Sequence, residues 1–171
     1  MATHDILTGL PNRRLLMDRI DSAIHRAYRE RQKVALLFID LDGFKSINDN
    51  HGHDAGDVVL KVVAERLSGL TRETDTVARL GGDEFVVVYT DVKEKREVPA
   101  LGKNILAALA APVILSQEHE GMIGGSIGIA LYPDNGNEGE AVLKAADDVM
   151  CAVKRQGKNS YLFADATPGL S

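Results

Sequence analysis

The stretch Leu80-Gly81-Gly82-Asp83-Glu84-Phe85 separates two short strand-like runs at residues 76–80 and 85–89. Glycine reaches the positive φ angles of tight hairpin turns, so this pattern predicts two antiparallel strands joined by a glycine turn. Asp83 and Glu84 would then lie at the tip of the hairpin. Packing gives no reason for two acids at such a place, and a functional role explains them better.

A second acidic pair, Asp40 and Asp42, ends the nearly continuous apolar run at residues 34–39, which predicts a strand buried on both faces. If this strand neighbours the hairpin, three or four carboxylates converge on one spot. Oxygen ligands in that number, with no Cys or His among them, favour Mg²⁺ and a phosphate-bearing substrate. Taken alone, an acid at a strand end can equally cap the next helix.

The length of 171 residues suits one domain over residues 1–171. We expect its core over about residues 5–163, with residues 164–171 as a tail that begins a linker in a longer protein. The net charge of −5 argues against a nucleic-acid partner. One cysteine excludes an internal disulfide and fits a reducing cytosol. No apolar run nears the roughly 18 residues of a membrane helix. We therefore expect no direct membrane contact and a cytoplasmic place, either alone or as the cytoplasmic part of a larger, membrane-anchored protein.

Hydrophobic periodicity predicts four long helices, at residues 13–31, 57–67, 99–111 and 138–155. A short helix is expected to begin at residues 43–46. Besides the hairpin, strands are predicted at residues 34–41, 113–115, 122–131 and 161–163, the middle two forming a pair. This alternation predicts an α+β domain with helices packed on a mainly antiparallel sheet. Cys151 falls on an apolar helix face and is expected in the core.

The letters at residues 81–85 are GGDEF, the signature of the diguanylate cyclase domain family that makes cyclic di-GMP from two GTP. Blocks that resemble the same family, in the same order and spacing, stand at residues 5–14, 38–57, 126–130 and 154–159. The resemblance spans about residues 5–163. It implies a ferredoxin-like βααββαβ palm of the nucleotidyl cyclase kind with an extra C-terminal hairpin. It also implies regulatory domains elsewhere in the full-length protein.

The resemblance implies two Mg²⁺ ions in each active-site half, with Mn²⁺ as an alternative ion. They would be held on the GTP phosphates by the Asp40 carboxylate, the Leu41 backbone carbonyl and the Asp83 carboxylate. Asp42 is left outside this set as a structural residue. A carboxylate beside the metal can accept the proton of the attacking 3′-hydroxyl. We assign this catalytic role to Asp83, with Glu84 in support.

The positions that match the family's GTP contacts are Phe44, Lys45, Asn48, Asp57, Gly81, Gly82, Lys154 and Lys158. Asn48 and Asp57 would read guanine, whose N1–H and N2–H₂ donors suit a carboxylate. Without the resemblance, Asp57 could equally be a helix N-cap and Lys45 an ordinary surface lysine. Lys158 stands where the family uses Arg, so it keeps the charge and loses the bidentate fork.

Arg72 and Asp75 supply R-x-x-D shortly before Gly81. By itself this pattern is an ordinary surface ion pair. At this offset it resembles the family's inhibitory site, where cyclic di-GMP binds as an intercalated dimer, and Arg79 would also touch this product.

Together these features predict a diguanylate cyclase that condenses two GTP into cyclic di-GMP and two pyrophosphates and is inhibited by its product. One domain offers one half of the active site, so a homodimer is needed. The alternatives are a catalytically silent module that binds GTP or cyclic di-GMP, and a cyclase acting on a single nucleotide. The intact hairpin tip argues against the silent module, and the guanine-reading pair against the single-nucleotide cyclase.

Overall fold

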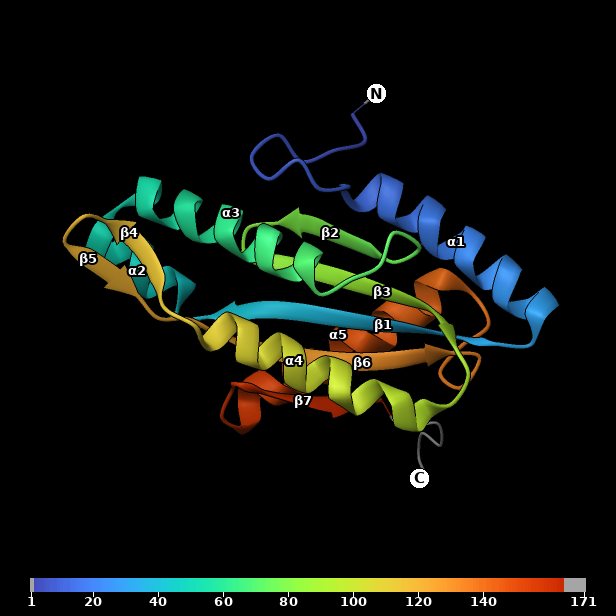
Figure 1. Cartoon of the computed structure of the whole chain (residues 1–171). Coiled ribbons are helices and arrows are strands. Elements are labelled where there is room, and N and C mark those ends of the chain that lie inside the picture. The colour runs from blue at the N-terminus through green and yellow to red at the C-terminus, as the bar shows by residue number, and fades with distance from the viewer. Residues whose placement is uncertain (1, 165–171) are drawn as a thin grey trace.

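A five-stranded sheet in the order β2-β3-β1-β6-β7 organises the computed structural model, which describes residues 2–164 (Figure 1). Its strands are β1 (Lys33–Asp42), β2 (Thr76–Gly81), β3 (Glu84–Val92), β6 (Gly124–Tyr132) and β7 (Ser160–Phe163). The helices are α1 (Arg13–Glu30), α2 (Phe44–His51), α3 (His53–Gly69), α4 (Val98–Ala110) and α5 (Gly139–Gln156), with a short 3₁₀ turn at Lys95–Glu97. Neighbouring strands are antiparallel except for β6 and β7, which are parallel.

Helices cover both faces of the sheet. Alternate β1 residues from Val34 to Phe38 pack in one cluster with α1 and α5. The intervening residues from Ala35 to Leu41 pack in a second cluster with α3 and α4. Figure 1 shows α3 and α4 in front of the sheet and α5 behind it. Burial on both faces explains why the β1 sequence is almost continuously apolar.

The element order confirms the predicted fold class. From β1 to β6 the chain runs β1-α2-α3-β2-β3-α4-β6, which is the βααββαβ order, and the sheet is mainly antiparallel. Its four core strands lie in the order β2-β3-β1-β6. The helix predicted to begin at residues 43–46 is the full helix α2.

The small hairpin is placed differently from the prediction. Strand β4 (Val113–Ser116) pairs with β5 (His119–Gly121) and not with the long strand that follows. That strand, β6, is buried almost throughout and enters the central sheet between β1 and β7. The extra hairpin therefore precedes the last core strand, and β7 is added alone at the sheet edge. The expected tail at residues 164–171 lies almost wholly outside the described residues.

Cys151 is exposed, which corrects the expectation of a core position. Its neighbour Met150 faces the sheet. The next residue of a helix points in another direction, so the side chain of Cys151 turns away from the sheet. The Cys151 thiol instead contacts Asp147 on the outer surface at 3.9 Å. Across residues 2–164, no helix combines the length and apolarity of a membrane span.

We predict that Gly128→Ala strongly destabilises the domain. An added Cβ on this β6 glycine would lie 2.0 Å from the Ala146 carbonyl oxygen and 2.4 Å from the Met150 nitrogen. Because both atoms belong to the backbone of α5, the helix would have to move off the sheet, at a cost of about 3 kcal/mol or more. Thermal unfolding measures the loss. Gly69→Ala is the matched control, because a Cβ there meets open space; equal melting temperatures for the two variants would contradict this packing.

Candidate active site

The hairpin tip and the end of β1 lie side by side. Asp40 is directly opposite Glu84 in the pairing of β1 with β3. One residue further along, the Leu41 N–H donates to the Asp83 carbonyl oxygen at 3.1 Å. The two glycines of the turn have φ angles of 144° and 49°, which other residues rarely adopt. The glycine turn thus brings two acids of the hairpin to the acid that ends β1.

The carboxyl groups of this cluster are costly to ionise. Burial raises the pKa of Asp40 to about 6, and the charge and hydrogen bond of Asp83 act in the same direction, although Lys154 opposes them. Burial also raises the pKa of Glu84, together with the charges of Asp147 and Asp83. Negative charge that is concentrated and poorly solvated favours the binding of a cation.

The donors at this place fit a magnesium ion. Among residues 2–164, no group of three or more His, Cys, Asp or Glu side chains could hold a metal. Two interacting carboxylates, Asp40 and Asp83, lie here beside the backbone of Leu41, whose N–H meets the Asp83 carbonyl oxygen. Mg²⁺ is commonly bound by one or two carboxylates and completed by water and substrate phosphates, which is the arrangement this set allows.

Asp42 has a different environment from Asp40. It is buried, and it accepts hydrogen bonds from the Ser126 hydroxyl at 2.8 Å, the Lys154 ammonium at 3.2 Å and the Asn159 N–H at 2.8 Å. These bonds join the end of β1 to β6 and to the turn that follows α5. Neither acid caps α2, because the N-cap is Gly43 and no side chain caps that helix.

Three lysines belong to the segments next to the acidic cluster, and one of them, Lys154, contacts Asp40 at 3.0 Å. Lys154 lies in the last turn of α5, and Lys158 lies in the turn beyond it with a φ of 65°. Lys45 is exposed in the first turn of α2, next to Phe44 at the start of that helix. The N–H groups at the start of α2 are suited to phosphate oxygens. Of these positive groups, the structure shows only the Lys154 ammonium in contact with the acids.

Asn48 and Asp57 lie on the neighbouring helices α2 and α3. The Asn48 Oδ1 atom is buried and has no hydrogen-bond partner within residues 2–164. It lies against Gly56, where an added Cβ would come within 1.9 Å of it. Asp57 is exposed and lies inside α3, whose N-cap is Gly52, so the N-cap interpretation of Asp57 is excluded. Asp57 is thus open to solvent, whereas the Asn48 Oδ1 atom is covered and unpaired.

Arg72 and Asp75 form a local ion pair. The fully buried Asp75 carboxylate accepts from the Arg72 Nε atom at 3.1 Å and from the Thr90 N–H at 3.0 Å. Arg72 also donates to the Thr90 carbonyl oxygen at 2.7 Å, while 59% of its side chain stays exposed. Asp75 therefore holds the guanidinium of Arg72 in a fixed position at the surface.

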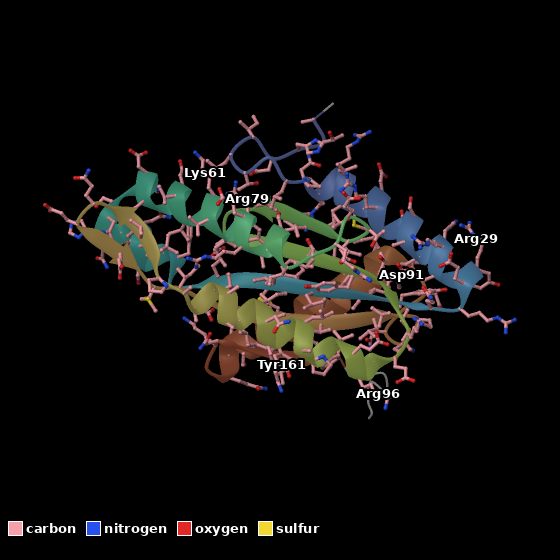
Figure 2. All side chains as sticks on the ribbon, viewed as in Figure 1. Arg29, Lys61, Arg79, Asp91, Arg96 and Tyr161 are labelled. Carbon is pink, nitrogen blue, oxygen red and sulfur yellow. The ribbon has the colours of Figure 1, made fainter. Side chains whose placement is uncertain are left out.

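Arg79 is not brought together with Arg72 and Asp75, because it lies at the other end of β2. Its guanidinium pairs with Asp5 at 3.0 Å and donates to the Gly82 carbonyl oxygen at 2.8 Å. Arg79 thus ties the N-terminal segment to the glycine turn (Figure 2).

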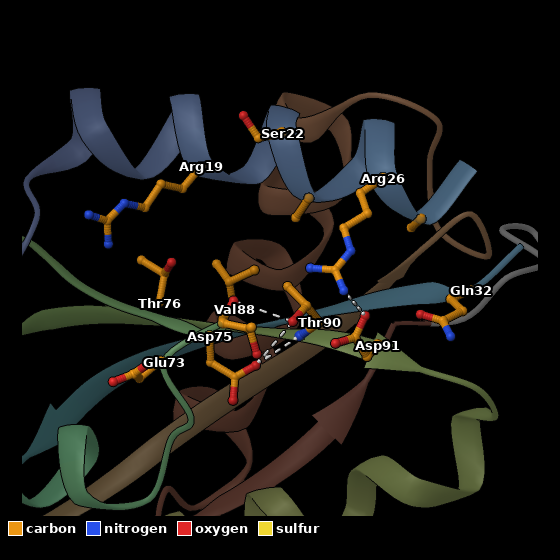
Figure 3. Close-up of a pocket in the computed structure, with 13 residues that line it drawn as sticks. Arg19, Ser22, Arg26, Gln32, Glu73, Asp75, Thr76, Val88, Thr90 and Asp91 are labelled. Carbon is orange, nitrogen blue, oxygen red and sulfur yellow. Dashed lines mark hydrogen bonds and ion pairs between the residues drawn. The ribbon is translucent and has the colours of Figure 1, made fainter. Parts of the chain in front are cut away.

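A cavity of about 310 Å³ opens beside Asp75, between α1 and the strands β2 and β3. Figure 3 shows Arg19 and Arg26 reaching down from α1 toward it, with Thr90 and Asp91 on the opposite side. Arg26 pairs with Asp91 at 3.3 Å. These two arginines match no motif in the sequence and were not among the predicted binding residues. Their spacing of seven residues is the one local signal that places them on the same face of a helix.

Comparisons with known proteins show the family and the fold of the chain. The family model described as "Diguanylate cyclase, GGDEF domain" matches residues 2–160. The chain is 44% identical over 167 residues to the bifunctional diguanylate cyclase/cyclic di-GMP phosphodiesterase MucR of Pseudomonas aeruginosa, covering 98% of this chain and 24% of MucR. It is 43% identical over 164 residues to the diguanylate cyclase TpbB of the same species, covering 96% of this chain and 38% of TpbB. The chain therefore spans well under half the length of these relatives.

Two solved structures have the same fold. The GGDEF domain of TpbB superposes with a TM-score of 0.93 at 42% identity, covering 98% of both chains. The GGDEF domain of DgcB from Caulobacter crescentus, solved in complex with c-di-GMP, superposes with a TM-score of 0.85 at 30% identity, covering 96% of both chains.

We predict that Asp40→Asn stabilises the domain in the presence of a metal chelator. Because the pKa of Asp40 is raised, the folded protein keeps a proton that the unfolded chain loses between about pH 4 and 6. Ionised Asp40 therefore costs stability above that window. The gain at pH 7.5 should be about 1 kcal/mol once solvent screening is considered, and it should vanish near pH 4.

Denaturant unfolding between pH 4 and 8 measures this difference. Asp18→Asn, on the exposed face of α1, is the control and should change stability little at any pH. A loss of stability in Asp40→Asn at pH 7.5 would contradict the electrostatic argument.

Proposed function

Because the chain belongs to the GGDEF domain family of diguanylate cyclases, we propose that it condenses two GTP into cyclic di-GMP and two pyrophosphates. The observation that supports this most directly is the meeting of Asp40 with the hairpin acids Asp83 and Glu84. The alternative of a silent binding module is less well supported, because the hairpin tip is intact and its acids face the end of β1.

The reaction joins the 3′-hydroxyl of one GTP to the α-phosphorus of the other, with pyrophosphate as the leaving group. Mg²⁺ or Mn²⁺, two ions in each half-site, would lower the pKa of the hydroxyl and neutralise charge on the leaving group. Asp40 and Asp83, with the Leu41 carbonyl, are the residues that would hold these ions. Asp83 accepts the hydroxyl proton in this proposal, and Glu84 adds negative charge beside it.

The remaining residues bind and orient GTP. Lys154, Lys158 and the start of α2 at Phe44 and Lys45 are positioned for the phosphates, while the glycine turn leaves space for them. The Oδ1 of Asn48 is unpartnered but covered, so a guanine donor would reach it once the amide rotates, and that contact would remove the cost of a buried unsatisfied acceptor. Asp57, on the adjacent helix, would accept from guanine N1–H and N2–H₂.

A homodimer follows from the number of sites. Each domain has one acidic cluster and one candidate guanine site, while the reaction consumes two GTP and forms two phosphodiester bonds. Two domains that face each other in antiparallel fashion would each present one GTP to the other. We also propose that the domain is one unit, residues 1–171, of a longer protein with regulatory domains, because the relatives above are longer.

Product inhibition is the second part of the proposal. Arg72 is exposed and held by a buried carboxylate through Nε and Nη2, so little side-chain entropy is lost when its remaining Nη1 group donates to phosphate or guanine. Arg72 lines a hollow of about 240 Å³ with Asp75, Tyr89 and Leu101. Bound cyclic di-GMP would meet its guanidinium group there, at a site distant from the hairpin tip. Arg19 and Arg26 line the separate cavity between α1 and the strands.

The activity is tested with the purified protein, GTP and Mg²⁺, with chromatography of the nucleotides. We expect cyclic di-GMP and pyrophosphate in a ratio of 1:2, and a specific activity that rises with protein concentration as dimers form. Asp83→Ala should lower turnover at least about 100-fold, while Asp148→Ala, an exposed residue of α5, should not. Folded Asp83→Ala protein with full turnover would refute the assignment, and wild-type protein that binds GTP without product would favour the silent module.

Arg72→Ala should weaken product inhibition. We expect the cyclic di-GMP concentration that halves the initial rate to rise at least about tenfold, because a charge-assisted hydrogen bond is lost. The uninhibited rate should stay within about twofold of wild type. Arg29→Ala removes an exposed α1 arginine that lies outside this cavity (Figure 2) and should leave inhibition unchanged. Equal inhibition of the Arg72→Ala and wild-type proteins would show that this site does not act.

A further inference from the structure

The ammonium group of Lys154 lies between two carboxylates. Its Nζ atom is 3.0 Å from Asp40 Oδ1 and 3.2 Å from Asp42 Oδ1. The exposed fractions of the three side chains are 30% for Lys154, 16% for Asp40 and 10% for Asp42. The contact is therefore partly shielded from solvent. Charge interactions in such a place are stronger than in an ordinary surface ion pair.

The two carboxylates differ in what else they contact. Asp42 also accepts from the Ser126 hydroxyl and the Asn159 N–H, so it stays hydrogen-bonded if the ammonium moves. Asp40 lies opposite the hairpin tip and is the carboxylate that the proposed metal needs. Lys154 thus has a permanent anchor in Asp42 and a contested partner in Asp40.

We propose that Lys154 is a positioning residue that competes with the divalent ion for Asp40 and releases it only when the triphosphate arrives. This inference rests on the proposed function. Without nucleotide, the ammonium neutralises Asp40 and repels an entering divalent cation. With nucleotide, the phosphates attract the ammonium away from Asp40, while its contact with Asp42 Oδ1 keeps it beside the site.

Competition of this kind couples two binding events. A metal ion alone meets a site that already contains a positive charge, so it binds weakly. A metal ion together with the triphosphate meets a site in which that charge has turned to the phosphates, so both bind better. The coupling is reciprocal, because each ligand must raise the affinity of the other by the same factor. Lys154 would thereby prevent the domain from loading metal before GTP.

A second consequence concerns the turn after α5. Asp42 accepts from the N–H of Asn159, the residue that follows Lys158, and both residues have positive φ angles. The same carboxylate therefore anchors the ammonium of Lys154 and the turn that carries Lys158. When the nucleotide binds, both lysines act on it from one fixed support.

The test measures Mn²⁺ binding without nucleotide, by the electron paramagnetic resonance signal of the free ion. Lys154→Met should bind Mn²⁺ at least about fivefold more tightly than wild type, because a positive charge about 3 Å from a metal ligand is gone. The same variant should bind a non-hydrolysable GTP analogue with Mn²⁺ at least about tenfold more weakly. Lys154→Arg should resemble wild type in the metal-only titration, since it keeps the charge.

Further variants separate this inference from the function on which it rests. Lys144→Met, on the same helix but 75% exposed and paired with Asp148, should change neither affinity. Asp40→Asn should lose Mn²⁺ binding; if it binds as wild type does, the proposed metal site itself is wrong. If Lys154→Met does not fold, Lys154→Gln tests the same loss of charge.

Two results would overturn the proposal that Lys154 competes with the divalent ion for Asp40. In the first, the folded neutral variant binds Mn²⁺ alone no more tightly than wild type while its affinity for the GTP analogue falls, and Lys154 is then only a phosphate ligand. In the second, neither affinity changes, and the ion pair is then only structural.

Discussion

The pairing register of β1 with β3 is the constraint on which the rest of the site depends. Asp40 faces Glu84 only because residues from Ala35 onward are matched one to one across the two strands. Side chains alternate between the faces of a strand, so a slip of one residue would turn Asp40 toward α3 and α4. The same slip would turn Phe38 into the other hydrophobic cluster, whose packing it does not fit, and would bury a charge in the core. Hydrophobic burial on both faces of β1 therefore fixes the geometry of the acidic cluster at its end.

The second requirement is the close contact of α5 with the sheet. Gly128 lets the backbone of α5 approach β6, and this approach is what carries Lys154 over the end of β1. The turn after the helix then returns to Asp42 through the N–H of Asn159. Two segments separated by more than a hundred residues thus share one carboxylate. Packing in the middle of the sheet determines charge positions at its edge.

The fold could be predicted in large part from the sequence, because its apolar periodicity and glycine turn are local signals. The segment at residues 119–121 could not, since His-Glu-Gly has no strand pattern and pairs only because β4 is adjacent. The prediction of a buried Cys151 was wrong because adjacent residues of a helix point in different directions, and only Met150 of this pair faces the sheet. For the site, spacing and resemblance identified the acids, but they could not show that Asp42 is saturated with donors or that Arg79 and Arg72 lie at opposite ends of β2. Such facts arise from tertiary contacts.

The site also shows where this domain gives up stability. The half-buried carboxylates Asp40 and Asp83, the unpartnered Asn48 oxygen and the positive φ angles of Lys158 and Asn159 belong to segments that follow or contact the end of β1. Each is unfavourable by itself, and none is needed to hold the two hydrophobic clusters together. Because a cation, a guanine and a triphosphate would relieve these costs at once, ligand binding and local order should rise together. If the proposed function holds, the unpaired and charged groups of this half-site would find their partners in the bound substrate.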